Sequence, residues 1–328
     1  MNNAWRQKSI VAKWWQDVRA PLKSPLLAAL RVRQWTKNLI VFAAPLFALN
    51  INLLTLLNST LAFSLFCAAS SSFYLINDII DVKADRCHPI KCKRPIAAGL
   101  IGIPVAVAMA VGLLSSALLV SWLIKPGLGA AITGYAILQI AYNFRLKRTV
   151  ILDVIAIATG FVLRAYAGAA ISNVTLSSWF LLCTAMLALF LAIEKRKAEL
   201  RLAQAQSKPV RAVLRRYSLS LLDRMEGIVT TGVFITYALW SSGPRLDGAS
   251  TRWMLLTLPL VLYGIFRYQF LSDPQQISRF DNLGDEVGGK TERPEEILLS
   301  DRPILLTVIA WVLTTLTILL LKQQNILA

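Results

Sequence analysis

The sequence predicts an all-α integral membrane protein with nine transmembrane helices, and three observations support this prediction. The chain of 328 residues is 56% hydrophobic, and its mean hydropathy is +0.56. Its apolar runs reach the length of about 20 residues that a helix needs to cross a bilayer. Its Lys and Arg residues gather in alternate loops between those runs, which is the pattern expected when basic loops stay in the cytoplasm.

The nine expected helices are apolar runs separated by more polar loops. The weakest predictions are the first run, which contains Pro45, Asn50 and Asn52, and the short fourth run. Proline is tolerated in a membrane helix where neighbouring groups satisfy the carbonyl that it leaves free. The expected spans are 38–57, 60–80, 101–123, 127–144, 150–171, 176–194, 219–241, 253–271 and 303–321.

The basic residues also predict the orientation of the chain. They lie in the leading segment and in the loops after the second, fourth, sixth and eighth spans, whereas the opposite side carries only Lys125, Arg245, Arg252 and Lys322. This distribution predicts a cytoplasmic N-terminus and a C-terminus outside, as in a bacterial inner (plasma) membrane. The net charge of +17 then follows mostly from topology, although basic loops also attract anionic membrane lipids and phosphate-bearing substrates. Nucleic-acid binding is disfavoured, because the charge is divided among loops between membrane helices.

Composition distinguishes two parts of the chain. Residues 1–25 are basic and rich in Trp, which is typical of a segment that lies in the membrane interface. Residues 26–328 are expected to form a single transmembrane domain, because no loop is long enough to fold alone. The four cysteines lack Cys-x-x-Cys spacing and His88 is the one histidine, so a zinc site is disfavoured. Cys87 and Cys92 lie on an expected cytoplasmic loop and are expected to be reduced thiols.

The most informative segment ends the second expected span and carries Asp78, Asp81 and Asp85, after Asn77. Acids are costly next to hydrocarbon, so a cluster of them there indicates a functional site. On a helix these positions project within one narrow arc, where like charges repel. A divalent cation would remove that repulsion, and Mg²⁺ usually binds one or two carboxylates together with substrate phosphates. The alternative is a solvated acidic helix end without a function.

A second group of polar residues surrounds the fourth and fifth expected spans and contains Tyr142, Lys147, Asp153 and Arg164. Arg164 follows Asp153 by eleven positions, which returns it to nearly the same helix face about 16 Å deeper. An arginine at that depth must face a polar cavity or a partner. One interpretation is a cationic cluster for substrate phosphates, with Asp153 as a metal or hydroxyl ligand. The other is an Asp–Arg or Tyr–Arg pair that locks helices together.

Three further polar sites in the sequence, two single residues and one charged run, give weaker indications of a function. Lys37 is interpreted either as an interfacial anchor or as a substrate contact. The charged residues from Glu194 to Glu199, at the end of the sixth span, are expected mostly to snorkel or to be solvated. His88 is interpreted as a loop residue beside Pro89 rather than as a catalytic group.

Several of these segments resemble one known family. The Asn-Asp-x-x-Asp-x-x-x-Asp pattern of residues 77–85 resembles the first aspartate-rich motif of the UbiA-type prenyltransferase superfamily. The continuation to residue 99 and the opening at 33–46 are similar to its decaprenyl-phosphate phosphoribosyltransferase branch. Further similarity lies at 142–153, 194–200, 294–297 and 301–302, so the resemblance runs from about residue 26 to the C-terminus.

The resemblance implies a UbiA-like helical bundle with a polar cavity facing the cytoplasm, so that 26–328 is a catalytic domain. It implies Mg-dependent transfer of 5-phosphoribosyl from phosphoribosyl pyrophosphate to a polyprenyl (decaprenyl-like) monophosphate, with release of pyrophosphate. Mg²⁺, or Mn²⁺, which the sequence does not distinguish from it, would be held by the expected catalytic residues Asp78, Asp81 and Asp85. The expected substrate-binding residues are Lys37, Asn77, Lys91, Arg94, Tyr142, Lys147, Asp153 and Arg164.

One departure from the superfamily bears on the choice of branch. Its aromatic prenyltransferases carry a second motif with two acids, whereas here Asp153 is followed by Ile157 at the partner position. An alternative function is transfer of an isoprenyl group from a prenyl diphosphate to an aromatic or other lipid acceptor. A third hypothesis is a transporter or scaffold that uses buried charge without chemistry. Gly160, Gly168 and Ala169 would permit close helix contacts in a homo-oligomer.

Overall fold

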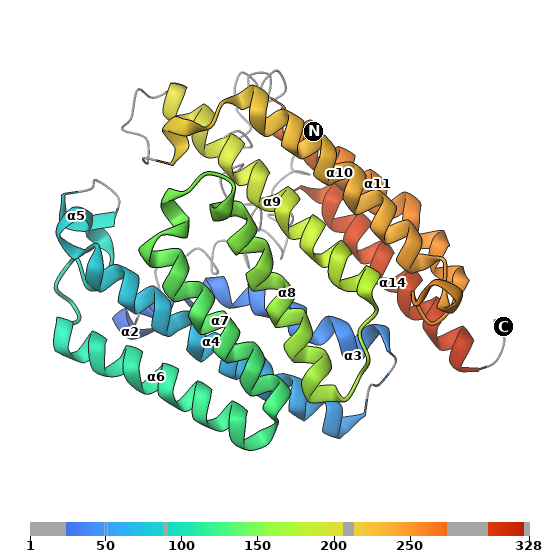
Figure 1. Cartoon of the computed structure of the whole chain (residues 1–328), viewed down its shortest axis with the longest axis horizontal. Coiled ribbons are helices and arrows are strands. Elements are labelled where there is room, and N and C mark those ends of the chain that lie inside the picture. The colour runs from blue at the N-terminus through green and yellow to red at the C-terminus, as the bar shows by residue number, and fades with distance from the viewer. Residues whose placement is uncertain are drawn as a thin grey trace, which may run out of the picture. The chain divides into compact units, whose positions relative to one another are not determined.

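The chain folds into helices, as its hydropathy predicts. A computed structural model of the protein describes residues 24–48, 50, 52–87, 91–205, 213–273 and 301–324. These residues form helices, turns and irregular segments and contain no strand (Figure 1). The all-α class is therefore confirmed for them. His88, the segment 294–297 and almost all of the interfacial segment 1–25 lie outside the described residues, so the interpretations given to them stay predictions.

The helices belong to two compact units, and the single catalytic domain expected at 26–328 stays a prediction. The first unit runs to Thr36 and resumes over Cys67–Ala117, whereas the second contains Lys37–Phe66 and the chain from Leu118 onwards. The first unit holds α2 (Pro25–Ala29), α5 (Val82–Arg86), η2 (Lys91–Lys93) and most of α6 (Ile103–Ile124). The second holds α3 (Ala43–Phe47), α7 (Pro126–Phe144), η3 (Leu146–Arg148), α8 (Leu152–Ser172), α9 (Ser178–Ala205), η4 (Leu214–Arg216), α10 (Leu219–Ser241), η5 (Pro244–Leu246), η6 (Arg252–Thr257), α11 (Leu258–Ser272) and α14 (Arg302–Gln323). Two further helices, η1 (Val32–Phe42) and α4 (Leu53–Ile80), belong partly to each unit.

Among the described residues, six helices are long and apolar enough to cross a membrane. They are α4, α6, α8, α9, the continuous η6–α11 helix and α14, and they match the second, third, fifth, sixth, eighth and ninth expected spans. The fourth and seventh expected spans are also helices, α7 and α10, but both are less apolar. The helix α7 contains Gln139 and Asn143, and α10 carries Asp223, Arg224 and Glu226. The chain is thus an integral membrane protein in which six of the nine expected spans meet both requirements.

The first expected span, 38–57, does not form one helix. The segment is divided into the 3₁₀ helix η1, the short helix α3 and the start of α4. The polar residues that weakened this prediction account for the break. Asn52 accepts a hydrogen bond from the backbone N–H of Thr55 at 2.7 Å, so it caps a new helix instead of continuing the old one. Asn50 donates to the carbonyl of Ser172 at 3.2 Å, at the end of α8.

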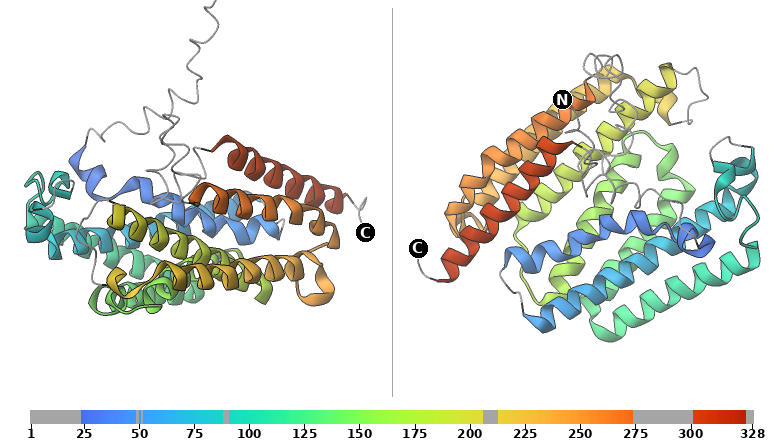
Figure 2. Two further views of the ribbon diagram at one scale, coloured as in Figure 1. Left: turned by 90° about the horizontal axis from the view of Figure 1, so that it is seen from above. Right: turned by 180° about the vertical axis from the view of Figure 1, so that it is seen from behind.

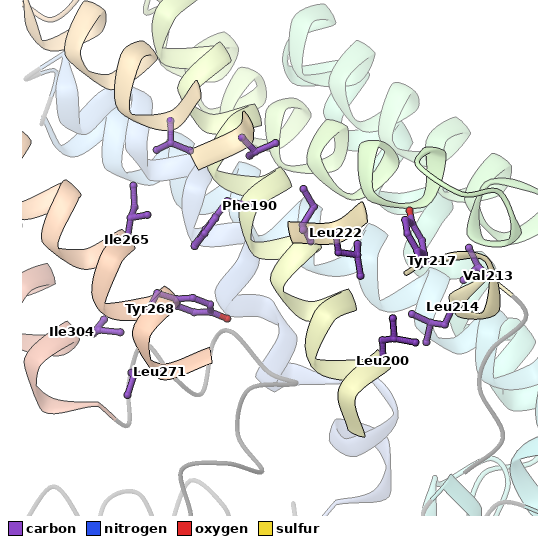
Figure 3. Close-up of a cluster of buried hydrophobic side chains, with 13 residues drawn as sticks. Phe190, Leu200, Val213, Leu214, Tyr217, Leu222, Ile265, Tyr268, Leu271 and Ile304 are labelled. Carbon is purple, nitrogen blue, oxygen red and sulfur yellow. The ribbon is translucent and has the colours of Figure 1, made fainter. Parts of the chain in front are cut away.

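The main core of the second unit lies between α9, α10 and α11. Phe190 of α9 packs edge-on against Tyr268 of α11, with ring centroids 5.5 Å apart, and Leu222 of α10 is fully buried. Figure 3 shows this cluster, which also takes in Tyr217 from the segment before α10. Within the same unit, α10 lies alongside α9, and α11 lies alongside α14 (Figure 2). The packing therefore fixes the end of α9 that carries its charged residues.

A close backbone approach fixes the η1–α3 segment on α8. A Cβ atom on Gly168 would lie 1.9 Å from the carbonyl oxygen of Val41, so a side chain at this position would force the two segments apart. Small residues allow such approaches between membrane helices. Gly168 therefore has a packing role inside the second unit, while the homo-oligomer contact suggested by the sequence stays a prediction.

Candidate active site

Two of the three expected catalytic acids are buried in the first unit and share one arginine. Asp78 of α4 and Asp85 of α5 are only 3% and 2% exposed. Arg94 Nη1 donates to Asp78 Oδ1 at 3.1 Å and to Asp85 Oδ2 at 2.6 Å. Lys91 Nζ lies 3.9 Å from the other oxygen of Asp85. The structure thus brings together four residues that the sequence nominates for one site.

The local geometry follows from a helix that continues through a small break. Asp81 leaves the α conformation, with φ −89° and ψ 4°, and separates α4 from α5. The helical hydrogen bonds nevertheless persist, because Asp81 N–H donates to Asn77 C=O and Asp85 N–H donates to Asp81 C=O. Asp78 and Asp85 therefore keep a common face, as the spacing predicts. Asp81 and Asn77 are half-buried, and their roles at the site stay predictions.

Arg31 is a member of this cluster that the sequence analysis did not nominate. Its Nη2 donates to Asp78 Oδ1 at 2.5 Å, and its guanidinium lies 4.9 Å from the centre of the Tyr74 ring. The preceding residue is held on α4, because Ser71 donates to the Leu30 carbonyl at 2.9 Å. Arg31 lies outside the aspartate-rich segment, and nothing in its local pattern indicates a pairing 47 positions along the chain.

The carboxylates of this cluster fit a divalent metal ion. Among the described residues no group of three or more His, Cys, Asp or Glu side chains could hold a metal. Mg²⁺, however, usually needs only one or two carboxylates, with substrate phosphates and water completing its shell. Arg94 contacts both carboxylates through the one atom Nη1, so Asp78 and Asp85 lie close enough together for one small cation to contact both. Both donors are hard oxygens, which suits Mg²⁺ and also Mn²⁺.

In the second unit, Asp153 is fully buried and both its oxygens have protein partners. Arg196 Nε donates to Asp153 Oδ2 at 2.8 Å, and the hydroxyl of Tyr217 donates to Oδ1 at 2.7 Å. Arg196 also donates to Glu199 at 2.7 Å, and Tyr142 lies close enough to interact with it electrostatically. Asp153 of α8 therefore forms its ion pair with Arg196 of α9, and not with Arg164 of its own helix.

Arg164 is also buried, in contact with neutral groups. It donates to Asn38 Oδ1 at 2.7 Å, to the Gly160 carbonyl at 2.8 Å and to the Tyr135 hydroxyl at 3.0 Å. Its guanidinium also lies 4.6 Å from the centre of the Tyr135 ring. These contacts match the interpretation in which a Tyr–Arg pair locks helices together. A phosphate contact for Arg164 stays a prediction.

The remaining expected substrate residues of the second unit are all half-buried. Lys37 is half-buried and precedes Asn38, the partner of Arg164. Lys147 is half-buried in η3, between α7 and α8. Tyr142 is half-buried near the end of α7. Their substrate roles stay predictions.

The expectation that the charges from Glu194 to Glu199 are mostly solvated is wrong. Glu194, Arg196 and Lys197 are 2%, 3% and 6% exposed, because α10 and α11 cover this end of α9. Lys197 pairs with Glu194 at 3.2 Å, with Asp223 at 2.9 Å and with Glu226. Acids and bases at spacings of three residues on α9 were an available signal for intrahelical pairs, but the partners from α8 and α10 were not.

Comparison with known proteins identifies the family. Residues 38–281 match the UbiA prenyltransferase family. The chain belongs to this family. It is 37% identical over 303 residues to the decaprenyl-phosphate phosphoribosyltransferase of Mycolicibacterium smegmatis, a match that covers 89% of this chain and 91% of that protein. Proteins of the same name from Mycobacterium tuberculosis and Corynebacterium glutamicum are 35% and 36% identical, covering 90% and 89% of this chain and 94% and 85% of theirs.

Solved structures of UbiA proteins share the fold of this UbiA-family chain. A UbiA homolog from Archaeoglobus fulgidus has a TM-score of 0.63 at 18% identity, with 90% of this chain and 98% of that chain covered. The same homolog bound to DMAPP and Mg²⁺ has the same TM-score at 19% identity, with the same coverage. At this identity the likeness establishes the fold alone. With the relatives above, it makes the chain an integral membrane transferase of the UbiA family.

Proposed function

We propose that this UbiA-family chain transfers the 5-phosphoribosyl group of phosphoribosyl pyrophosphate to a polyprenyl monophosphate. The observation that carries the proposal is its 35–37% identity, over 89–90% of the chain, to proteins named decaprenyl-phosphate phosphoribosyltransferase. The cluster of Asp78, Asp85, Arg94 and Arg31 supports it. Carboxylate oxygens suit a hard cation, and guanidinium groups suit phosphate.

The proposed reaction is a displacement at C1 of the ribose. One oxygen of the lipid phosphate forms a bond to C1 while the bond between C1 and the pyrophosphate oxygen breaks. The electron pair of the broken bond leaves with pyrophosphate, which therefore gains negative charge in the transition state. Preorganised cations stabilise charge that develops in this way. The attacking phosphate is already ionised at neutral pH, so no strong general base is needed.

The first-unit cluster supplies the groups for the donor diphosphate. Arg94, Lys91 and Arg31 are the proposed contacts for the departing pyrophosphate, and Asn77 is a proposed hydrogen-bonding group. Mg²⁺ held by Asp78, Asp85 and Asp81 would supply further neutralisation of the diphosphate charge. The side chains of Arg94 and Arg31 are partly exposed, at 29% and 28%. These arginines would therefore be able to exchange a protein carboxylate for a substrate oxygen.

Residues of the second unit have two different proposed roles. Lys37, Tyr142 and Lys147 are proposed as substrate contacts, because they are polar and only half-buried. The buried partners of Asp153 and Arg164 favour positioning roles for these two residues. The proposed orientation places the N-terminus and the basic loops in the cytoplasm and the C-terminus outside, on the evidence of the Lys and Arg distribution.

The test is a transfer assay with the purified, full-length chain. The assay contains phosphoribosyl pyrophosphate labelled in the ribose, a polyprenyl monophosphate and Mg²⁺, and the lipid fraction is separated by thin-layer chromatography. We expect a labelled lipid that is lost with EDTA, restored by excess Mg²⁺ and absent with Asp78→Asn. Asp247→Asn is the matched control, because this exposed acid lies outside both clusters, and it should leave the product unchanged.

The assay also tests the alternative chemistry. Parallel reactions contain a prenyl diphosphate with an aromatic acceptor in place of the two proposed substrates. Turnover in these reactions, without any labelled lipid from phosphoribosyl pyrophosphate, would replace the proposed donor by a prenyl diphosphate. Absence of turnover in every reaction, with protein that unfolds cooperatively, would favour a transporter or scaffold.

A further inference from the structure

The turn that leads into α8 is strained at Ile151. Its φ of +72° and ψ of −48° lie outside the regions that L-residues normally occupy, and a β-branched residue is poorly suited to a positive φ. Strained conformations of this kind persist only where the surrounding structure enforces them, and they cluster at functional sites. The Ile151 side chain is 45% exposed, so its own packing does not enforce the turn.

The hydroxyl of Tyr217 is hydrogen-bonded to the backbone of this turn. The backbone N–H of Ile151 donates to this hydroxyl at 2.8 Å, and the hydroxyl donates in turn to Asp153 Oδ1 at 2.7 Å. One oxygen atom therefore joins the residue before α8 to the carboxylate in its first turn. Tyr217 itself comes from the segment that precedes α10, more than sixty positions along the chain.

Tyr217 is firmly placed. It is 5% exposed and packs beside Val213 and Leu214, with its hydroxyl pointing away from Leu214 toward the neighbouring green ribbon (Figure 3). Burial raises the pKa of the Tyr217 phenol, and the hydrogen bond to Asp153 raises it further. The hydroxyl therefore keeps its proton at neutral pH and remains a donor. Arg196 holds the second oxygen of Asp153, so the acceptor is fixed as well.

The strained turn carries a basic segment. Arg145, Lys147 and Arg148 lie in or beside η3, immediately before the turn. Thr149 N–H donates to Leu146 C=O and closes η3, and Asp153 N–H donates to Thr149 C=O and joins the segment to α8. A change of backbone angle at Ile151 would therefore redirect all three cations relative to α8.

We infer that Tyr217 is a positioning residue that holds the basic η3 segment in place for a phosphate-bearing substrate. It acts through the Ile151 turn and Asp153, and not by touching the substrate. The inference rests on the proposed function only for the identity of that substrate. The conformational part of the inference, in which the hydroxyl enforces the turn, depends on the structure alone.

The first experiment uses amide hydrogen exchange to test the conformational part of the inference, that the Tyr217 hydroxyl enforces the turn at Ile151. Tyr217→Phe removes the hydroxyl and keeps the ring, and exchange in the peptide covering residues 145–153 should become about 2- to 10-fold faster, the range expected for one lost hydrogen bond. Ile151→Gly removes the strain, because glycine adopts a positive φ without a penalty. In that background, Tyr217→Phe should change exchange by less than about twofold, as residues in contact are energetically coupled.

The matched control is Tyr263→Phe, which removes the hydroxyl of a tyrosine that is 48% exposed on α11. It should leave exchange in 145–153 unchanged. Equal effects of Tyr217→Phe in the Ile151 and glycine backgrounds would overturn the inference, since the hydroxyl would then stabilise the fold without enforcing the turn. Unchanged exchange with Tyr217→Phe would overturn it as well.

The second experiment tests positioning for the substrate. In the transfer assay, Tyr217→Phe should raise KM for phosphoribosyl pyrophosphate or for the lipid phosphate about tenfold with a smaller change in kcat, because misplaced cations weaken substrate binding. Ile151→Gly should restore most of that loss. If the wild type shows no phosphoribosyl transfer, the proposed function fails while the exchange result still stands. If transfer occurs but Tyr217→Phe leaves both KM values unchanged, the positioning role fails alone.

Discussion

The Asp78–Asp85 cluster of the first unit and the Asp153–Arg196 pair of the second unit are built in opposite ways. In the first unit, Asp78 and Asp85 are buried, but the cations that pair with them reach the surface, with Arg94 at 29% and Lys91 at 36% exposed. In the second unit, Asp153 and its partner Arg196 are both buried, at 0% and 3%. A cation that reaches the solvent is partly screened, which reduces what its ion pair contributes to stability. A fully buried pair is costly to break, because either partner alone is an uncompensated charge.

This difference in burial suits the first cluster to ligand exchange and the second pair to support of the fold. Under the proposed function, the carboxylates of the first unit would exchange an arginine for a metal ion, and the freed arginines would contact the substrate diphosphate. The Asp153–Arg196 pair joins α8 to α9 and has no exposed cation to release. The comparison therefore predicts that mutations of the first unit affect ligands, whereas mutations of the second affect the fold.

The largest effect should come from Arg196→Met, which keeps an unbranched apolar stem and removes the charged guanidinium. Asp153 and Glu199 would lose this cation, and breaking a buried pair by removing one side costs about 3–5 kcal/mol. We expect a large fall in the unfolding temperature of the detergent-solubilised protein. Arg94→Met should lower that temperature far less. Equal losses for the two variants would remove the distinction between the clusters.

A second prediction concerns activity without a change of fold. Asp85→Asn keeps the shape of the side chain but removes a carboxylate proposed to bind the metal and Arg94. We expect kcat/KM for phosphoribosyl pyrophosphate to fall about 100-fold, equivalent to about 2.7 kcal/mol. The unfolding temperature should stay near that of the wild type. A variant that loses activity only in proportion to its loss of folded protein would contradict a direct role.

Arg94→Ala should change the affinities for metal and donor in opposite directions. Its guanidinium competes with a cation for Asp78 and Asp85, so its removal should tighten Mg²⁺ binding about threefold to tenfold in the absence of substrate. The same change should raise KM for phosphoribosyl pyrophosphate about tenfold, because a charge-assisted contact is lost. Calorimetric titration with Mg²⁺ and steady-state kinetics measure the two quantities. Weaker binding of both ligands would show that Arg94 supports the site without competing for it.

The sequence predicted local features well and distant pairings poorly. The face shared by Asp78 and Asp85 follows from helical spacing alone, and Lys91 and Arg94, which contact these acids, are close to them in the sequence. Hydropathy located six helices that can span a membrane. It misjudged residues 38–57, because it averages over a segment in which Asn52 acts as a cap.

The sequence could not predict ion-pair and hydrogen-bond partners on different helices, for a physical reason. The burial of Arg196 depends on how α8, α9 and α10 pack, and a charged run at the end of an apolar helix has the same pattern whether it is solvated or covered. Tyr217 is one of eight tyrosines, and its sequence neighbours carry no sign of the turn at Ile151 that it contacts. Such residues become visible only when the tertiary contacts and backbone angles are known.

The smallest effect should come from Arg31→Gln, which sharpens the comparison within the first unit. Arg31 contacts one carboxylate, Asp78, whereas Arg94 contacts two, and both donate to the same oxygen of Asp78. Removal of Arg31 therefore leaves Asp78 still paired, and we expect KM for phosphoribosyl pyrophosphate to rise about threefold with kcat little changed. Because Arg31 and Arg94 share an acceptor, their effects should not add, and the double variant with Arg94→Ala should differ from the sum by a measurable coupling. Strict additivity of the two changes would mean that the arginines act on the donor independently and that the shared carboxylate does not link them.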